Sequence, residues 1–150
     1  MIDCTTGDQD YELWLLLRRA GQAVKRNRDR ELSQYGLSSV QAGVLVVVEE
    51  LGDKAIPAEI SRHVLREAHS VSSLLTRMET QGLVKKVRDL DKANLVRISL
   101  TDRGRQALRQ SGKRESIRRV MSVLSEKERH ALMSSLKKIR DEAIKEPRKW

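Results

Sequence analysis

Residues 59–100 decide the fold, and they read EISRHVLREAHSVSSLLTRMETQGLVKKVRDLDKANLVRISL. Four apolar residues recur here at i, i+3, i+4 and i+7: Val71, Leu74, Leu75 and Met78. This spacing predicts a helix with one buried face. The other face carries small or hydrogen-bonding side chains: His69, Ser70, Ser72, Ser73, Thr76, Arg77 and Thr80. Such slim donors and acceptors suit a helix that enters a DNA groove about 12 Å wide, although Ser and Thr also occur on ordinary exposed helices.

A two-stranded hairpin is predicted to follow this helix. Gly82 comes where a helix commonly ends on a left-handed residue, and residues 95–100 alternate as a half-buried strand does. Residues 89–94 between the strands are polar and turn-forming. The candidates for phosphate contacts on this hairpin are Lys85, Lys86, Arg88, Lys92 and Arg97. Because Lys85 and Lys86 are adjacent, the first strand alternates poorly and its pairing register stays open.

A short helix before the groove-facing helix completes a winged helix-turn-helix. It begins at Pro57, a residue suited to the first helical position, and extends to about Leu65 with Ile60 and Val64 turned inward. The preceding residues 55–56 predict a brief strand at the edge of the hairpin.

A further helix is predicted over residues 39–51. Ser38 and Gln41 form a capping box at its start, and Gly52 closes it. The valines within this segment favour a strand. The two caps and the length of the segment favour a helix, and we predict a helix on these grounds.

Long amphipathic helices are predicted on both sides of this lobe. The first begins near Asp8 or Asp10 and ends at Tyr35 and Gly36. Its apolar stripe comprises Leu13, Leu16, Leu17, Ala20 and Val24. Its basic residues are Arg18, Arg19, Lys25, Arg26, Arg28 and Arg30. We interpret this basic set as a solvated face rather than a second DNA site, although it adds to the positive field.

After the hairpin, one long helix is predicted from the N-cap Thr101 to about Leu124, weakened locally by Gly104 and Gly112. A second capping box then opens a final helix that ends before Pro147. The capping residues are Ser125 and Glu128, and the stripe of this helix is Leu132, Leu136, Ile139 and Ala143.

The apolar stripes at both ends of the chain predict a homodimer. One small winged core cannot cover two long apolar faces at opposite termini, so a second copy of the chain is the economical partner. Recognition helices related by a two-fold axis lie about one turn of B-DNA apart, roughly 34 Å. The dimer therefore predicts a pseudo-palindromic double-stranded operator.

Length and charge bound the domain organisation and the partner. The 150 residues suit a single domain (1–150), with dimerisation helices at 8–35 and 102–146 and a DNA-binding lobe at 38–101 whose wing spans 84–100. A net charge of +9 favours a polyanion, either nucleic acid or an anionic membrane. The longest apolar runs fall far short of the ~20 residues that span a bilayer, and no secretory signal is visible. We therefore expect no membrane partner and a cytoplasmic location.

Residues for catalysis or for metal and cofactor binding are poorly represented. The three histidines (His63, His69 and His130) lack ligand spacing, and the sequence has no glycine-rich phosphate loop. The single Cys4 argues against a disulfide framework and leaves two alternatives, an oxidant sensor or an inert residue. We predict no enzyme activity, no metal and no cofactor.

The order of elements resembles the MarR family of bacterial transcription regulators. The motifs that carry the resemblance are Leu37-Ser38 with Gln41, Gln81-Gly82-Leu83-Val84, and Leu100-Thr101 with Gly104. The resemblance implies a mainly α fold with a small β-wing, N- and C-terminal dimerisation helices that interlock in a homodimer, and repression relieved by a ligand or an oxidant.

The resemblance also implies a pocket for a small-molecule effector where the dimerisation helices meet the DNA-binding lobe. Trp14, Arg18 and Tyr35 are the candidates, although Trp14 beside Leu13 and Leu17 also suits a core position. At the wing tip, members of the family often carry an arginine that enters the minor groove. The tip here contains no arginine, so Lys92 and then Arg97 are the substitutes.

A sequence-specific DNA-binding regulator is thus the leading interpretation. The alternative from another class is a winged-helix protein-interaction adaptor whose basic charge gives nonspecific nucleic-acid affinity. A nucleic-acid-processing enzyme is a third alternative, which the missing catalytic groups disfavour.

Overall fold

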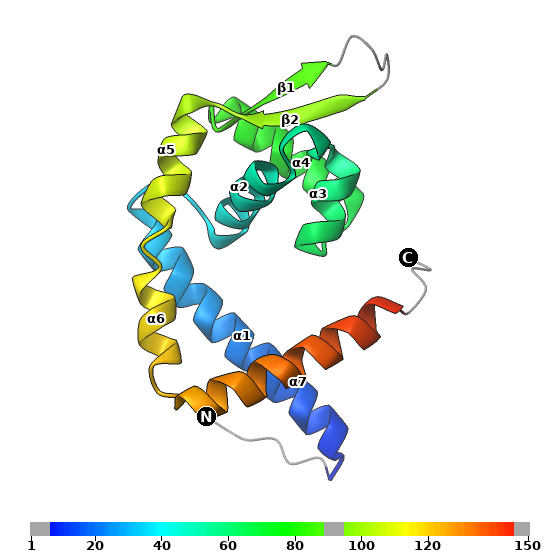
Figure 1. Ribbon diagram of the computed structural model, residues 1–150, viewed down its shortest axis with the longest axis vertical. Helices are drawn as coiled ribbons and strands as arrows, with labels where there is room; N and C mark the ends of the chain where they lie inside the picture. The colour runs from blue at the N-terminus through cyan, green and yellow to red at the C-terminus, as the bar shows by residue number, and fades with distance from the viewer. Residues whose placement is uncertain (1–6, 89–94, 146–150) are drawn as a thin grey trace. The chain divides into compact units, whose positions relative to one another are not determined.

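The computed structural model describes residues 7–88 and 95–145, which fall into two compact units, one ending at Arg114 and the other beginning at Glu115 (Figure 1). The first unit contains α1 (Gln9–Ser33), α2 (Ser39–Leu51), the 3-10 turn η1 (Gly52–Lys54), α3 (Pro57–Val64), α4 (Ala68–Thr80), β1 (Val84–Arg88), β2 (Val96–Leu100) and α5 (Asp102–Ser111). The second contains α6 (Glu115–Met121) and α7 (Glu126–Lys145). The predicted fold class, mainly α with a small β-wing, is confirmed. Cys4, Lys92, the tip 89–94 and Pro147 lie outside the described residues.

The core of the first unit forms where α2, α3 and α4 meet the hairpin. Its largest fully buried side chains include Leu45, Ile60, Leu75, Met78 and Ile98. The stripe predicted for α4 is buried along its whole length, as the helical spacing requires. Figure 1 shows the two strands extending from one end of this helical cluster. The lobe thus has a compact interior of its own.

Both predicted capping boxes are confirmed. At α2, the Gln41 amide N–H donates to Ser38 Oγ at 3.2 Å, and the Ser38 N–H donates to Gln41 Oε1 at 3.1 Å. At α7, Ser125 and Glu128 exchange the same pair of bonds at 3.0 and 3.1 Å. The backbone and side-chain hydrogen bonds from Ser125 lower the pKa of Glu128. Local side-chain chemistry therefore determines where these helices begin.

The hairpin register, which the sequence left open, pairs Val84 with Leu100 and Lys86 with Ile98 in an antiparallel sheet. Val84 is the one fully buried side chain of β1, which explains the weak alternation of this strand. The predicted strand at residues 55–56 is wrong. Ala55 accepts one hydrogen bond from the Ile98 N–H at 2.8 Å, and the described sheet has two strands only.

Two helix boundaries also differ from the predictions. The helix predicted from Thr101 to Leu124 is two helices, because α5 ends at Ser111 and Arg114 adopts a left-handed φ of 53° before α6. Gly112 is the C-cap of α5, consistent with the low helix propensity of glycine. The N-terminal helix begins after its N-cap Asp8, as predicted, but ends at Ser33, two residues early, with Gly36 at φ 69° in the following turn.

Candidate nucleic-acid interface

The exposed face of α4 is the centre of the candidate interface, and we call α4 the recognition helix. The predicted residues lie on it as expected: His69, Ser72, Ser73, Thr76 and Arg77 are exposed, and Ser70 is half-buried. The apolar stripe packs this helix against the core and leaves the polar face turned to solvent. The face can therefore approach a groove without rearrangement of the fold.

Some hydroxyl groups on this face already donate their proton to a hydrogen bond within the helix. Thr76 Oγ1 donates to the Ser72 carbonyl and Thr80 Oγ1 donates to the Thr76 carbonyl, both at 3.1 Å. Their protons are used within the helix, so these oxygens are left as acceptors. The exposed guanidinium of Arg77 provides up to five donors in a planar fork, a geometry that matches the O6 and N7 acceptors of guanine.

The turn between α3 and α4 sets the angle of the recognition helix. Leu65 occupies a left-handed conformation with φ 53°, and the Arg66 N–H donates to the Ser61 carbonyl at 3.2 Å. The buried Ser61 hydroxyl donates in return to the Arg66 carbonyl. The sequence patterns did not single out Ser61. A serine at a buried helical position, where an apolar residue is usual, was the available signal.

The far end of the recognition helix is held by two side-chain contacts. Gln81 Oε1 accepts a hydrogen bond at 2.8 Å from Gln41 Nε2. Gln41, a member of the capping box of α2, therefore also holds the end of α4 in place. One oxygen of Glu79 accepts from the Lys86 N–H at 3.3 Å, and the other lies 3.9 Å from Lys86 Nζ. The C-terminal end of the recognition helix is thereby joined to the first strand of the wing.

The wing residues are not equivalent once their partners are known. Lys86 pairs with Glu79, and Arg97 pairs with Asp53 at 3.2 Å, which holds β2 to the turn after α2. Lys85 and Arg88 are exposed and have no ion pair with any other described residue. These two are the freest cations of the described wing.

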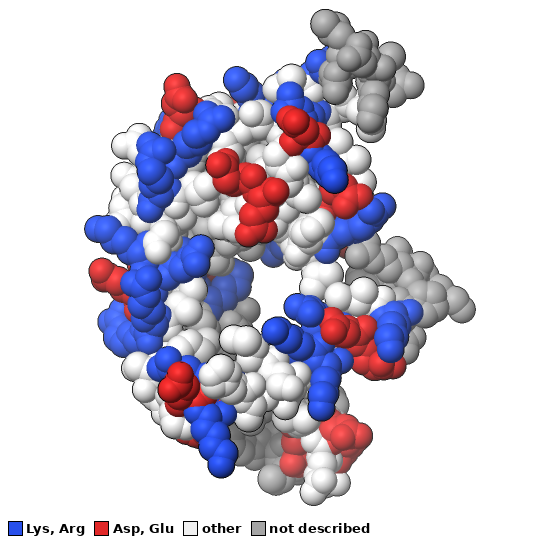
Figure 2. All heavy atoms as spheres, viewed as in Figure 1, with Lys and Arg blue, Asp and Glu red and all other residues white. Residues whose placement is uncertain are grey.

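Charge is unevenly distributed over the first unit. Figure 2 shows Lys and Arg side chains over α5 and near the hairpin, whereas Asp and Glu side chains cover part of α2 on the face in view. The exposed acidic residues of this region are Glu49, Glu50 and Asp53. A polyanion is therefore attracted to the basic hairpin and repelled by the exposed end of α2.

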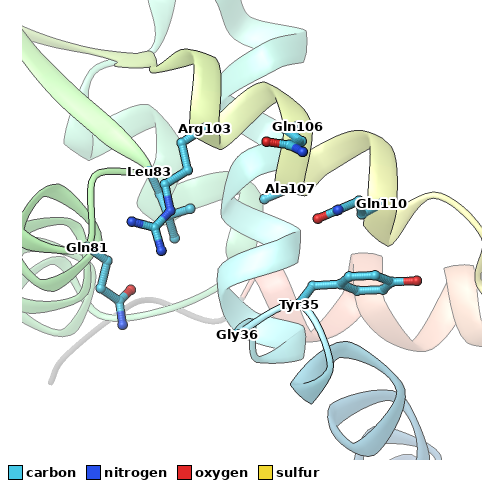
Figure 3. A pocket seen from close by; sticks show the side chains of 8 residues that line it. All are labelled: Tyr35, Gly36, Gln81, Leu83, Arg103, Gln106, Ala107 and Gln110. Atoms are coloured by element: carbon cyan, nitrogen blue, oxygen red, sulfur yellow. The ribbon is translucent and has the colours of Figure 1, made fainter.

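The cavity that Tyr35 lines does not include the other two candidate effector residues, Trp14 and Arg18. Tyr35 lines a cavity of about 260 Å³ with Gly36, Gln81, Leu83, Arg103, Gln106, Ala107 and Gln110 (Figure 3). Trp14 and Arg18 lie elsewhere on α1, with the Arg18 guanidinium carbon 5.8 Å from the Trp14 ring centroid. Trp14 is 50% exposed, so the core position considered for it is wrong for the single chain.

Gly104 has a different role from the one expected of it. A Cβ at this position would overlap the backbone carbonyl oxygen of Leu83. The same segment is fixed by Thr101, whose hydroxyl accepts from the Gly104 N–H at 3.0 Å and shares its one proton between the carbonyls of Gly82 and Leu83. Gly104 thus lets α5 pack against the chain that links the recognition helix to the wing.

Arg28 is a second correction, because the solvated basic face predicted for α1 does not include it. Its side chain is buried, with 8% of the residue exposed, and Nη2 donates to the Ser111 carbonyl at 2.7 Å. Helical position alone could not reveal a bond to a residue 83 positions away.

Side chains of the types that can bind metal ions are scattered along residues 7–88 and 95–145. Across these ranges, His, Cys, Asp and Glu side chains do not gather in groups of three that could hold a metal ion. Within the same part of the chain, no helix is both long and apolar enough to cross a membrane.

An exposed recognition helix followed by a basic two-stranded wing defines the winged helix-turn-helix class. Residues 35–103 match the model of the MarR family. The chain is 29% identical over 136 residues to the HTH-type transcriptional regulator TtmR of Methylorubrum extorquens (strain PA1), an alignment that covers 89% of this chain and 68% of TtmR.

Solved structures agree with this assignment. The organohalide-sensing regulator RdhR in its 2,4-dichlorophenol-bound form has a TM-score of 0.84 and 28% identity, covering 90% of this chain and 81% of RdhR. A cysteine-to-serine mutant of Escherichia coli MarR, complexed with operator DNA, shares the fold with a TM-score of 0.81, 19% identity and coverage of 91% and 99%. Residues 35–103 therefore resemble the MarR family of transcriptional regulators, the described fold is similar to that of the solved regulator RdhR, and these relatives are regulators rather than enzymes.

Proposed function

We propose that the chain is a homodimeric repressor that binds a pseudo-palindromic double-stranded DNA operator and is released from it by a small ligand or another signal. The observation that carries this proposal is a helix face of small polar side chains next to a basic wing. Contacts between Glu79 and Lys86 join the helix to the wing. The resemblance to MarR in complex with operator DNA supports the same assignment. Binding to chromosomal DNA implies a cytoplasmic location, and no cofactor is required.

Sequence preference is assigned to the recognition helix. Ser73 is exposed, and Arg77 presents a guanidinium suited to a bidentate contact with a guanine edge. His69, Ser70, Ser72 and Thr76 flank these two on the same face. Contacts of this kind distinguish base pairs in the major groove, whereas phosphate contacts do not.

The wing is assigned to the DNA backbone. Lys85 and Arg88 supply positive charge without an acidic partner among the described residues, while Lys86 and Arg97 combine a charge with a structural ion pair. Interactions of this type add affinity that falls as salt rises. Lys92, at the tip, is our candidate for the minor-groove contact.

The dimer is supported by apolar surface that each unit leaves uncovered when taken by itself. Along α1, Tyr11, Leu13, Trp14, Leu16 and Leu17 are exposed. Along α7, not one side chain between Glu126 and Lys145 is buried, and Leu132, Met133, Leu136, Ile139 and Ile144 are exposed. Exposed apolar residues in such numbers mark an interaction surface, and a second copy provides the complementary stripes.

Release by an effector is supported by the relatives and by two places in the chain. RdhR was solved with 2,4-dichlorophenol bound. In this chain, Tyr35 and Arg103 line a polar cavity that also contains Gln81, the residue that follows the recognition helix. Trp14 and Arg18 form a second, exposed pair, which the dimer would cover.

The direct test is a gel-shift assay with DNA from upstream of the protein's own gene. We expect a shift that weakens as salt is raised, resists excess unrelated DNA, and is reversed by an effector among added small aromatic metabolites. A shift abolished equally by any competitor DNA would contradict specific regulation and favour the adaptor with nonspecific affinity. Replacing both Ser73 and Arg77 by Ala provides the matched control, since it leaves the charge of the wing intact.

A further inference from the structure

Two consecutive residues of α1 bind the ends of two different helices, α2 and α5, which together with α3, α4 and the hairpin make up what we call the winged lobe. The first contact is made by Asp29, whose Oδ1 accepts the Ser39 N–H at 2.7 Å. Ser39 is the first residue of α2, and its amide has no acceptor within the helix. The other carboxylate oxygen, Oδ2, pairs with Lys25 Nζ at 2.9 Å. Asp29 therefore acts as a capping residue supplied from another helix.

The second contact is made by Arg28, at the opposite end of a helix. Its Nη2 donates to the carbonyl of Ser111, the last residue of α5, at 2.7 Å. This carbonyl also has no donor within its helix. Nη1 pairs with Glu31 Oε1 at 3.1 Å, and both of these side chains are nearly buried. A buried arginine bound in this way is fixed in position, because breaking either contact leaves a buried polar group without its partner.

The charges of the two residues match the helix ends that they meet. A helix N-terminus attracts negative charge and a C-terminus attracts positive charge, which is the arrangement of Asp29 at α2 and Arg28 at α5. Partial burial alone would raise the pKa of Asp29, but hydrogen bonds from Lys25 and Ser39 outweigh it and lower the pKa to about 2. The Asp29 carboxylate is thus charged throughout the physiological range.

We propose that Arg28 and Asp29 form a joint that sets the orientation of the winged lobe on α1, and through it the spacing of the two recognition helices in the dimer. This inference rests on the proposed dimeric function. α2 has 13 residues and is about 20 Å long, so a rotation of about 10° at its start moves its far end by about 3.5 Å, close to the rise of one base pair. Arg28 and Asp29 are positioning residues that need not touch DNA.

The main test varies the DNA rather than the protein alone. An operator selected from random DNA is rebuilt with its half-sites moved apart or together by one and two base pairs, and each probe is titrated with parent protein and variants. Arg28→Lys keeps the charge beside Glu31 but cannot reach both partners, and a double variant, Arg28→Met with Glu31→Met, removes the buried pair while conserving volume. Arg26→Lys, an exposed arginine on the same helix, is the matched control.

We expect the affinity of the joint variants to fall about tenfold at the parent's best spacing and much less at other spacings, since simultaneous engagement of two half-sites depends on geometry. Arg26→Lys should reproduce the parent profile. Folded joint variants that keep the parent's spacing profile would overturn the proposal. An equal decrease at every spacing would also overturn it, because that result reports reduced stability rather than altered spacing.

A second measurement separates the joint from the proposed function. Spin labels on the exposed sites Arg19 of α1 and Glu50 of α2, introduced as cysteines with Cys4→Ser and diluted with unlabelled protein, report a distance within one chain. The joint variants should broaden this distance distribution, whether or not the protein dimerises or binds DNA. An unchanged, narrow distribution refutes the joint by itself, whereas failure of the parent to bind a palindromic site refutes the proposed function alone.

Discussion

The recognition helix α4 and the terminal helix α7 carry the same apolar pattern, yet the chain covers only one of them. In α4 the stripe is buried against the lobe, while in α7 the corresponding residues Leu132, Leu136 and Ile139 are 37–43% exposed. Helical periodicity reports that a face must avoid water, and it does not report what covers that face. The difference divides the molecule into a lobe whose apolar faces are covered within the chain and helices whose apolar faces a second copy would cover in the proposed dimer.

The largest expected effect comes from breaking the uncovered face. Leu136→Glu places a carboxylate on a position that is 37% exposed in the single chain, so the chain itself should fold normally. Burying that carboxylate in a dimer costs several kcal/mol, which should abolish the dimer and operator binding together. Sedimentation at micromolar concentration and a gel shift measure the two effects.

Ser134→Glu is the control, because it adds the same charge on the opposite side of α7 and should remain dimeric. A Leu136→Glu protein that still dimerises would contradict the prediction. So would a parent protein that stays monomeric and binds one half-site with full affinity.

The next largest effect is expected on the stability of the lobe, from a substitution in its interior. Gly104→Ala forces a Cβ onto the Leu83 carbonyl and should lower the free energy of unfolding by about 3 kcal/mol, at the upper end of the usual cost of overpacking. Gly43→Ala is the matched control, since Gly43 lies in α2 with open space around it. That change should raise the same free energy by up to about 1 kcal/mol. Denaturant unfolding measures the free energy of unfolding of both variants. Equal values for the two variants would refute the close approach of Gly104 to the Leu83 carbonyl.

A smaller effect is expected on the polar face of α4, which the lobe leaves exposed. Arg77→Ala should cost about 1–3 kcal/mol of operator binding for a bidentate base contact and relax the preference at one position in each half-site. Binding measured against a set of operator variants tests this. A decrease that is uniform across all sequences would instead assign Arg77 to phosphate. If Arg77→Ala and Ser73→Ala both bind as tightly and selectively as the parent, the assignment of this face fails.

The smallest effect is expected at the wing. Lys85→Ala should reduce the slope of log affinity against log salt by about 0.9 for each phosphate that the wing no longer neutralises, or about 1.8 for a dimer with both wings bound. Lys86→Ala should change the slope less, because Glu79 already neutralises part of its charge. Sequence preference should hardly change in either variant. Identical slopes for parent and Lys85→Ala would remove this lysine from the interface.

Much of the winged lobe and the start of α7 could be predicted from the sequence because their signals are local. The capping boxes at Ser38 and Ser125, the stripe of α4 and the outward face from His69 to Arg77 each involve residues a few positions apart. The same reasoning failed where two local signals competed. Continuous apolar spacing favoured one helix from residue 102 to 124, and the break at Gly112 and Arg114 prevailed.

The partners of the charged side chains could not be predicted, and they changed the interpretation of several residues. Arg97 and Lys86 were grouped with the other cations of the wing, but each has an acidic partner within the chain. Tyr35 was grouped with Trp14 and Arg18, although its cavity is lined by α5 and by the segment after α4. Such pairings join residues distant in sequence, and no periodicity encodes them.

The sequence by itself determined the types of the helices, most of their ends and the faces that must be buried, because these follow from backbone geometry and from side chains three or four positions apart. The tertiary structure alone decided that Gly104 must admit the Leu83 carbonyl and that Arg28 closes the end of α5 rather than facing solvent. Both contacts arise when separate helices come together in the folded lobe. Their physical reason is close approach between distant segments, where a missing Cβ or a buried hydrogen bond matters more than local propensity.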